Sequence, residues 1–254
     1  MSLGTIARRG AKAAVLPAAP WTRRRAGDLV ILLYHRVGEG GGEIELPVES
    51  FERQMAHLAE RERVRPLGDA LADGEGGVVV TFDDGSPDFH STVLPILVRH
   101  RVPAVLYLAT GMVGEEALSW PQLADAVSTG LVTVGAHTHS HKDLSRASER
   151  DAEDEMRRSQ ELVEDRLGVP CRHFAYPWAV GSAAADRAAR RLFDSAAWDA
   201  WRTNRRGRTE PYRLGRTPVL RSDGRAFFRA RVAGMLDGEA WVYRALRRGP
   251  WRAP

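Results

Sequence analysis

The sequence contains a single cysteine, Cys171, among its 254 residues. An intrachain disulfide is therefore impossible, which excludes a small secreted module held together by disulfide bonds. Lysine occurs only at Lys12 and Lys142, so nearly all of the positive charge comes from arginine. The arginines are spread along the chain among 33 acidic residues, and the formal net charge is +4. Because this distribution is not typical of a nucleic-acid-binding surface, we expect no nucleic-acid partner.

Long apolar runs are also missing, and no stretch approaches the length of a transmembrane helix. Residues 1–27 are rich in alanine, arginine and proline, and their short apolar part is interrupted by Pro17, so they make a poor signal peptide. We expect an N-terminal arm, disordered or docked on the surface. A cytoplasmic location follows, with a secreted or cell-envelope location as the alternative, and a peripheral contact of the arm with anionic lipid stays open.

Beyond residue 27, apolar strands alternate with amphipathic helices. This alternation is typical of parallel strands joined by helical crossovers, and about seven units favour a closed or nearly closed α/β barrel in one domain, residues 28–254. Ser50 is expected to cap the first helix, and residues 66–71 to form a short connection and half-turn. The predicted strands are 29–33, 78–82, 103–108, 132–135, 171–176, 196–201 and 214–220, and the predicted helices are 48–63, 92–100, 118–128, 148–167, 183–193 and 227–247.

The stretch from Val78 to Gly85 joins an apolar strand directly to two adjacent carboxylates, Asp83 and Asp84. Burying two carboxylates side by side is costly unless a cation neutralises them. The alternative is a solvated turn, because Asp-Asp-Gly is also ordinary turn chemistry. This stretch alone does not decide between a metal site and a turn.

Three histidines, His137, His139 and His141, follow the strand that ends at Gly135. In a helical turn only His137 and His141 would meet, whereas a polar loop that happens to hold histidines is the alternative. Two histidines and one aspartate form a ligand set of catalytic zinc sites, which leaves a position open for water. A second aspartate beside this set would then act as the base.

Four predicted strands end in polar or aromatic groups: His35, the aspartate pair, the histidines and the segment 176–178. In β/α barrels the catalytic residues gather where the strands end and the following loops begin. The sequence therefore predicts a catalytic site at one end of the barrel.

Three runs, Thr81-Phe82-Asp83-Asp84-Gly85, His137-Thr138-x-x-His141 and Phe174-Ala175-Tyr176-Pro177, together resemble the polysaccharide deacetylases, which form the fourth family of carbohydrate esterases and share the NodB-homology domain. The resemblance covers residues 28–235 approximately. It implies an irregular (β/α)7 barrel that removes an acetyl group from an N-acetylated amino sugar in a poly-, oligo- or lipid-linked saccharide. It also implies one divalent metal ion, zinc in first place and cobalt or nickel otherwise.

Carried over residue by residue, the resemblance makes Asp83 the general base and Asp84, His137 and His141 the metal ligands. His139 falls on a variable position and stays outside the ligand set.

The resemblance also assigns the walls of the site. Tyr176 matches the position whose backbone N–H helps to hold the oxyanion. Trp178, Trp120 and the Tyr176 side chain would contact the sugar, although a core aromatic is the alternative for Trp178. Arg216 would lie at the substrate site, where it could pair with Asp83 and keep it ionised.

The sequence departs from the family pattern in two places. The usual Pro-aromatic-Gly reads Pro177-Trp178-Ala179, and the late Leu-x-His that supplies the general acid in many members is absent. His35 then becomes the candidate acid, and it is similar to the histidine of poly-N-acetylglucosamine deacetylases; the alternative is that it only bonds a neighbouring loop. Alternatives for the whole protein are a deacylase or esterase for another acyl group and a catalytically silent sugar-binding relative.

Overall fold

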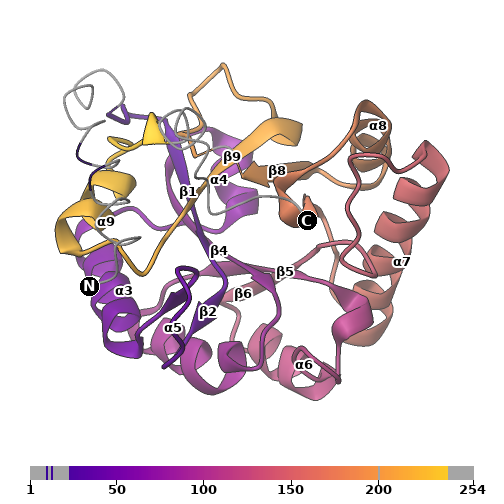
Figure 1. The fold of residues 1–254 in the computed structure, drawn as a ribbon, viewed down its shortest axis with the longest axis horizontal. Coiled ribbons are helices and arrows are strands. Elements are labelled where there is room, and N and C mark those ends of the chain that lie inside the picture. Colours follow the sequence, from indigo (N-terminus) through magenta and orange to yellow (C-terminus); the bar gives the residue numbers. More distant parts are fainter. Residues whose placement is uncertain (1–9, 11–12, 14–22, 200, 240–254) are drawn as a thin grey trace.

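The computed structural model describes residues 23–199 and 201–239, together with the isolated positions 10 and 13. Seven parallel strands close into a barrel, and β1 at one end of the order pairs with β9 at the other. The predicted (β/α)7 barrel is thereby confirmed (Figure 1). In barrel order the strands are β1 (Leu29–Tyr34), β4 (Gly77–Asp84), β5 (Ala104–Leu108), β6 (Val132–Ala136), β7 (His173–Ala175), β8 (Ser195–Asp199) and β9 (Leu214–Pro218).

Helices surround the barrel, and Figure 1 shows them as an outer ring. They are α3 (Val48–Arg61), α5 (Leu94–His100), α6 (Trp120–Ser128), α7 (Glu149–Leu167), α8 (Ala183–Leu192) and α9 (Arg225–Val232). The short helix α4 (Leu67–Asp73) differs, because its Leu67 and Ala70 pack with Leu29 and Ile31 of β1 in the cluster that fills the barrel. Outside the barrel, β2 (Arg36–Val37) pairs with β3 (Glu45–Leu46).

Side chains along the barrel strands alternate between the barrel interior and the surrounding helices. In β4, Val78, Val80 and Phe82 belong to the cluster that packs with the helices, whereas Val79 belongs to the interior cluster. Asp83 lies four residues after Val79 and is therefore on the same side of the strand. In β9 the interior residue is Leu214, and Arg216 follows two positions later. The strand period therefore brings a carboxylate and a guanidinium to the same end of the barrel interior.

The structure corrects two expectations for the first helices. The segment 66–71 is largely helical, because Leu67 and Ala70 bury their side chains in the barrel, a partner that local sequence does not show. Ser50 does not cap α3, since the helix starts after Pro47 and has no side-chain cap. The backbone N–H of Ser50 instead donates to the Pro47 carbonyl at 2.9 Å.

Both ends of the chain lie in part outside the described residues. The predicted helix 227–247 is shorter than expected, because α9 ends at Val232 and residues 233–238 form turns; residues 240–247 are not described. Most of the predicted arm, 1–27, is likewise outside. Its described end lies against the end of α9, where the backbone N–H of Arg24 donates to the Ala233 carbonyl at 2.8 Å. Within the described parts of the chain, no helix has both the length and the apolar character to cross a membrane.

An aromatic cluster fastens α3 to the barrel, and it generates a stability prediction. Phe51 is fully buried, and its ring lies edge-on to Tyr34 and Phe82 with centroids 5.4 and 5.8 Å apart. Phe51→Ala should lower the free energy of unfolding by about 3–5 kcal/mol, because it leaves a cavity among these rings. Urea denaturation measures the loss. Glu60 is exposed on the same helix, and Glu60→Ala should change the free energy of unfolding by less than about 0.5 kcal/mol. Equal effects of the two variants would contradict the packing described.

Candidate active site

Polar side chains from several strands meet where the strands of the barrel end. They line a cavity of about 170 Å³. Seven of the nine predicted site residues are in its wall, which shows that the strand ends converge as expected. The cavity is lined by Leu33, His35, Ile44, Asp83, Asp84, His137, His141, Trp178, Ala179 and Arg216.

Asp83 is held by a bidentate ion pair. Its Oδ1 and Oδ2 lie 2.5 and 2.7 Å from the two terminal nitrogens of Arg216, and both side chains are buried, with 4% and 1% of their surface exposed. Burial raises the pKa of the Asp83 carboxyl, but the Arg216 guanidinium and His137 outweigh this, so the pKa lies below its ordinary value. Arg216 thus faces Asp83, and the pairing that the sequence suggested is the one observed.

Asp84, the neighbouring carboxylate, faces both histidines, whereas Asp83 has only His137 near it, with Nε2 3.8 Å from its Oδ2. Oδ1 of Asp84 lies 3.6 Å from Nε2 of His137 and 3.2 Å from Nε2 of His141. One ligand atom from each of the three residues lies within 4.8 Å of the others. One carboxylate oxygen and two imidazole nitrogens are the donors that a divalent cation such as zinc takes, and this spacing lets them share one ion. The three residues fit a metal site.

The tautomer of His137 is set by the barrel. Its Nδ1 lies 2.8 Å from the backbone carbonyl of Ala175, so Nδ1–H donates and Nε2 is left as an acceptor towards the cavity. Burial lowers the pKa of His137 to about 4, although Asp83 and Asp84 oppose the shift. The imidazole is therefore neutral near pH 7, the form that binds metals.

The backbone at the site adopts conformations that L-residues rarely take. Among the described residues, seven non-glycine residues have positive φ, and five of them are at this site: Asp84, Thr138, His141, Trp178 and Ala179. Asp84 occupies the middle of a three-residue turn closed by a 2.9 Å hydrogen bond from the N–H of Gly85 to the carbonyl of Asp83. Such conformations persist only where the surroundings hold them, and here they aim ligand side chains into one cavity.

His35 lies in the same wall, directly after β1. The Ser86 hydroxyl bridges the His35 carbonyl, at 3.2 Å, and Oδ1 of Asp88, at 2.6 Å, while Oδ2 of Asp88 accepts the N–H of Val37 at 2.7 Å. These bonds fix the backbone on both sides of the imidazole. Burial lowers the pKa of His35, and the carboxylates of the two site aspartates oppose the shift.

The predicted aromatic contacts are only partly present. Trp178 is 40% exposed, and its ring lies edge-on to that of His141 with centroids 4.8 Å apart, so the alternative of a core aromatic is wrong. Trp120 does not line the cavity; it starts α6 and packs against the hydrophobic core.

The prediction for Tyr176 is contradicted. Its backbone N–H donates to the carbonyl of Ala197 at 3.1 Å, so this hydrogen is used within the barrel rather than turned to an oxyanion. Its side chain is fully buried and packs on Trp198, with ring centroids 4.4 Å apart. Tyr176 therefore supports the loop and does not wall the cavity.

The chain is similar to known proteins over part of its length. Residues 71–193 match the family model of the polysaccharide deacetylases. The chain contains a polysaccharide deacetylase domain. It is 34% identical over 113 residues to the chitooligosaccharide deacetylase of Sinorhizobium fredii, which covers 43% of this chain and 50% of that protein. It is 28% identical over 115 residues to the poly-β-1,6-N-acetyl-D-glucosamine N-deacetylase of Staphylococcus aureus, which covers 40% of each. The chain thus spans half or less of the length of these relatives.

Solved structures match over more of the chain. IcaB from Ammonifex degensii superposes with a TM-score of 0.70 at 25% identity, over 85% of this chain and 97% of that one. The Streptococcus pyogenes deacetylase PplD, solved in complex with acetate, gives a TM-score of 0.71 at 21% identity, over 78% of this chain and 94% of that one. These likenesses extend across the barrel and confirm the fold of the deacetylase domain.

The parts of this site that the sequence did not predict depend on contacts between distant segments. Ile44, from the loop between β2 and β3, lines the cavity but stands in a glycine-rich stretch with no distinguishing pattern. The group that orients His137 is the backbone carbonyl of Ala175. Every residue has such a carbonyl, so the residue type at position 175 does not indicate this role. Asp88 lies in a Ser-Pro-Asp turn, and this turn chemistry is the one signal that could have indicated it.

The buried pair gives a prediction on pH and stability. Arg216→Met leaves the Asp83 carboxylate buried without its partner and should cost about 3–5 kcal/mol of unfolding free energy near pH 7. Without the guanidinium, burial raises the pKa of Asp83 above its unfolded value, so the variant loses stability as pH rises above about 4, whereas the lowered pKa of the parent gives the opposite sign. The gap between parent and variant should therefore widen from acidic to neutral pH in urea denaturation of metal-free protein. A gap that does not depend on pH would show that Asp83 is not the group involved.

Proposed function

We propose that this polysaccharide deacetylase is a metal-dependent hydrolase that removes the acetyl group from an N-acetylated amino sugar in a poly-, oligo- or lipid-linked saccharide. The observation that carries the proposal is the division of labour between two adjacent carboxylates in one cavity. Asp84 faces both histidines, whereas both oxygens of Asp83 are bonded to Arg216 and only His137 lies near it. A silent sugar-binding relative would not need a second, ionised carboxylate beside a metal-ligand set, so this arrangement supports an enzyme.

Asp84, His137 and His141 would hold the cation, with zinc favoured by the mixed nitrogen and oxygen donors and cobalt or nickel as alternatives. When bound, a divalent cation polarises the acyl carbonyl and makes a nearby water more acidic.

The other residues of the cavity transfer protons or orient the substrate. Asp83 accepts the proton of the attacking water, and Arg216 keeps that carboxylate ionised and fixed before the reaction. The amine that leaves must gain a proton, and His35 is the donor we assign because it lies in the same wall. Trp178 presents an exposed ring against which a sugar face would pack.

The substrate class follows from what the similar proteins are said to act on. Two of them are described as a chitooligosaccharide deacetylase and a poly-β-1,6-N-acetyl-D-glucosamine N-deacetylase. Both names describe acetylated glucosamine polymers, and this supports an amino-sugar substrate for the present chain.

The proposal is tested by acetate release from purified protein. Zinc- or cobalt-loaded protein should release acetate from N-acetylglucosamine oligomers, and a chelator should abolish the release until metal is added back. An O-acetylated xylan oligomer serves as the control for another acyl linkage. Release from the xylan alone would identify an esterase, and full activity after exhaustive chelation would exclude the metal-dependent reaction.

Two variants test whether the adjacent carboxylates have different roles, one as base and the other as metal ligand. Asp83→Asn should keep the bound metal but lose about 10²–10⁴-fold in turnover, the usual contribution of a positioned base. Asp84→Asn should lose the metal as well, because two histidines seldom retain zinc. Metal content by plasma emission spectrometry and acetate release measured on the same samples distinguish the two. Equal metal loss in both variants would contradict the assignment.

The role of His35 is tested with leaving groups of different basicity. His35→Ala should slow amide hydrolysis by about 10²–10⁴-fold while metal content stays unchanged. The loss should be much smaller for an aryl acetate, which departs without protonation. Since burial lowers the pKa of His35, amide turnover by the parent should fall as pH rises and the imidazole loses its proton. If amide and aryl ester slow equally, the proton comes from another group.

A further inference from the structure

One carboxylate of α7 fastens the loop that carries the two histidine ligands. Oε2 of Glu155 accepts the backbone N–H groups of His139 and Ser140 at 3.0 and 2.8 Å, and its Oε1 accepts the Ser140 hydroxyl at 2.8 Å. Both residues lie between His137 and His141 in the sequence, and Ser140 directly precedes His141. Because hydrogen bonds to a charged acceptor are stronger than neutral ones, this side chain restrains the loop.

The opposite side of the loop is held by the turn after β5. The N–H of Gly111 donates to the carbonyl of His139 at 2.7 Å, and the Thr110 hydroxyl lies 3.0 Å from Nδ1 of the same histidine. A Cβ at Gly111 would lie 2.7 Å from that carbonyl, so glycine is needed for this close approach. His139, which is not in the ligand set, is thus an attachment point of the loop.

The two ligand histidines depend on this attachment to different degrees. His137 is fixed by the barrel itself, since its N–H donates to the Leu108 carbonyl at 3.0 Å and its ring to that of Ala175. His141 follows Ser140 directly and has a φ of 56°, a conformation that L-residues rarely adopt. We propose that Glu155 is a positioning residue that holds His141 in reach of the cation, an inference that rests on the metal-dependent function proposed above.

The test measures metal affinity rather than activity. Glu155→Ala should weaken cobalt binding by about 10–100-fold in competition with a chelator and change the visible spectrum of the bound cobalt, as loss of an outer support does at metal sites. Glu155→Gln should restore most of the affinity, because its amide still offers an acceptor and donors to Ser140. Glu161→Ala, an exposed glutamate of the same helix, is the matched control and should leave affinity unchanged.

Amide hydrogen exchange supplies a readout that needs no metal. In Glu155→Ala the amide of Ser140 should exchange faster because its acceptor is removed, whereas the amide of His139 keeps the backbone carbonyl of residue 155, at 3.1 Å in the parent. Circular dichroism and the amides of β6 should stay as in the parent. Parental affinity and parental exchange in Glu155→Ala would overturn the inference alone. If the parent binds no divalent metal but the exchange effect is present, the proposed metal function is overturned. The hydrogen bonds of Glu155 would then restrain the loop without positioning a metal ligand.

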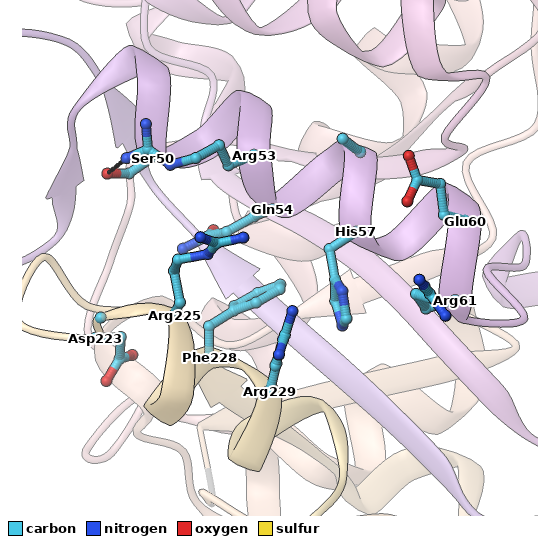
Figure 2. Close-up of a pocket in the computed structure, with 12 residues that line it drawn as sticks. Ser50, Arg53, Gln54, His57, Glu60, Arg61, Asp223, Arg225, Phe228 and Arg229 are labelled. Carbon is cyan, nitrogen blue, oxygen red and sulfur yellow. Dashed lines mark hydrogen bonds between the residues drawn. The ribbon is translucent and has the colours of Figure 1, made fainter.

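A different cavity carries a second inference. A groove of about 480 Å³ lies between α3 and α9, outside the barrel mouth. Figure 2 shows Arg225, Phe228 and Arg229 of α9 facing Gln54 and His57 of α3. Within the described ranges of the chain, no ion pair joins Arg225, Arg229 or the lining Arg61 to an acid.

The polar groups of this groove are mostly donors. Gln54 is 6% exposed, and its Oε1 accepts the Tyr34 hydroxyl at 2.9 Å, which leaves the amide NH₂ as its other polar end. Two acids also line the groove, Glu60 and Asp223. Asp223 pairs with Arg231 at 2.5 Å, and the same guanidinium pairs with Glu239 at 2.8 Å. We propose that the groove binds a phosphoryl group, carried by a soluble phosphate or by a lipid headgroup, because guanidinium groups pair with phosphate oxygens.

Two probes separate these sources. Binding of inorganic phosphate, measured by titration calorimetry, should weaken by about tenfold or more in Arg229→Gln and stay unchanged in Arg166→Gln, an exposed arginine of α7. If the headgroup is the source, the same difference should appear in sedimentation with phosphatidylglycerol vesicles and not with phosphate. The inference is overturned if neither probe distinguishes the two variants.

Discussion

The buried ion pair between Asp83 and Arg216 is the interaction on which the rest of the site depends. Two adjacent carboxylates end one strand, and neither could be buried as an ion without a counter-charge. The period of the strand sends them to different surroundings, so Asp83 meets the guanidinium of β9 and Asp84 meets two histidines. Because Arg216 neutralises Asp83, the histidines are left to complete a ligand set with Asp84 alone. One carboxylate is thereby kept for proton transfer and the other for coordination.

This separation requires an unusual backbone around the cavity. Asp84, His141 and Trp178 all have positive φ, and each lies at or beyond the end of a different barrel strand. Such conformations cost free energy, on the order of 1–3 kcal/mol each, and they persist only where neighbouring groups fix them. Glu155 is such a neighbour, because it accepts hydrogen bonds from the residues that directly precede His141. The precision of the cavity therefore comes from polar contacts behind it as much as from the ligands themselves.

The parts that the sequence predicted are those that local pattern controls. Val78 to Val80 are apolar on both faces because their strand is covered on both sides, and the same reasoning located the other barrel strands. The pairing of Asp83 with Arg216 was open to prediction because both follow or lie within apolar strands whose ends must meet.

The predictions that were wrong or incomplete concern residues whose contacts are made by distant segments. The backbone N–H of Tyr176 donates to the carbonyl of Ala197, and Leu67 of α4 is buried in the barrel interior. In both cases the partner is distant in the sequence. Glu155 stands in a polar helix where nothing marks it from its neighbours, and its role appears only when the histidine loop packs beside it. A motif can indicate which residues react, but it does not show which backbone groups are already occupied.

The central claim is that Asp84, His137 and His141 bind one cation while Asp83 remains paired with Arg216. Anomalous scattering from a crystal of the zinc-loaded protein, recorded on both sides of the zinc absorption edge, tests it most directly. The account predicts one difference peak within about 2.0–2.2 Å of a carboxylate oxygen of Asp84 and of Nε2 of both histidines, with the Asp83–Arg216 pair intact. A zinc peak bound by Asp83, or none in this cavity, would contradict it.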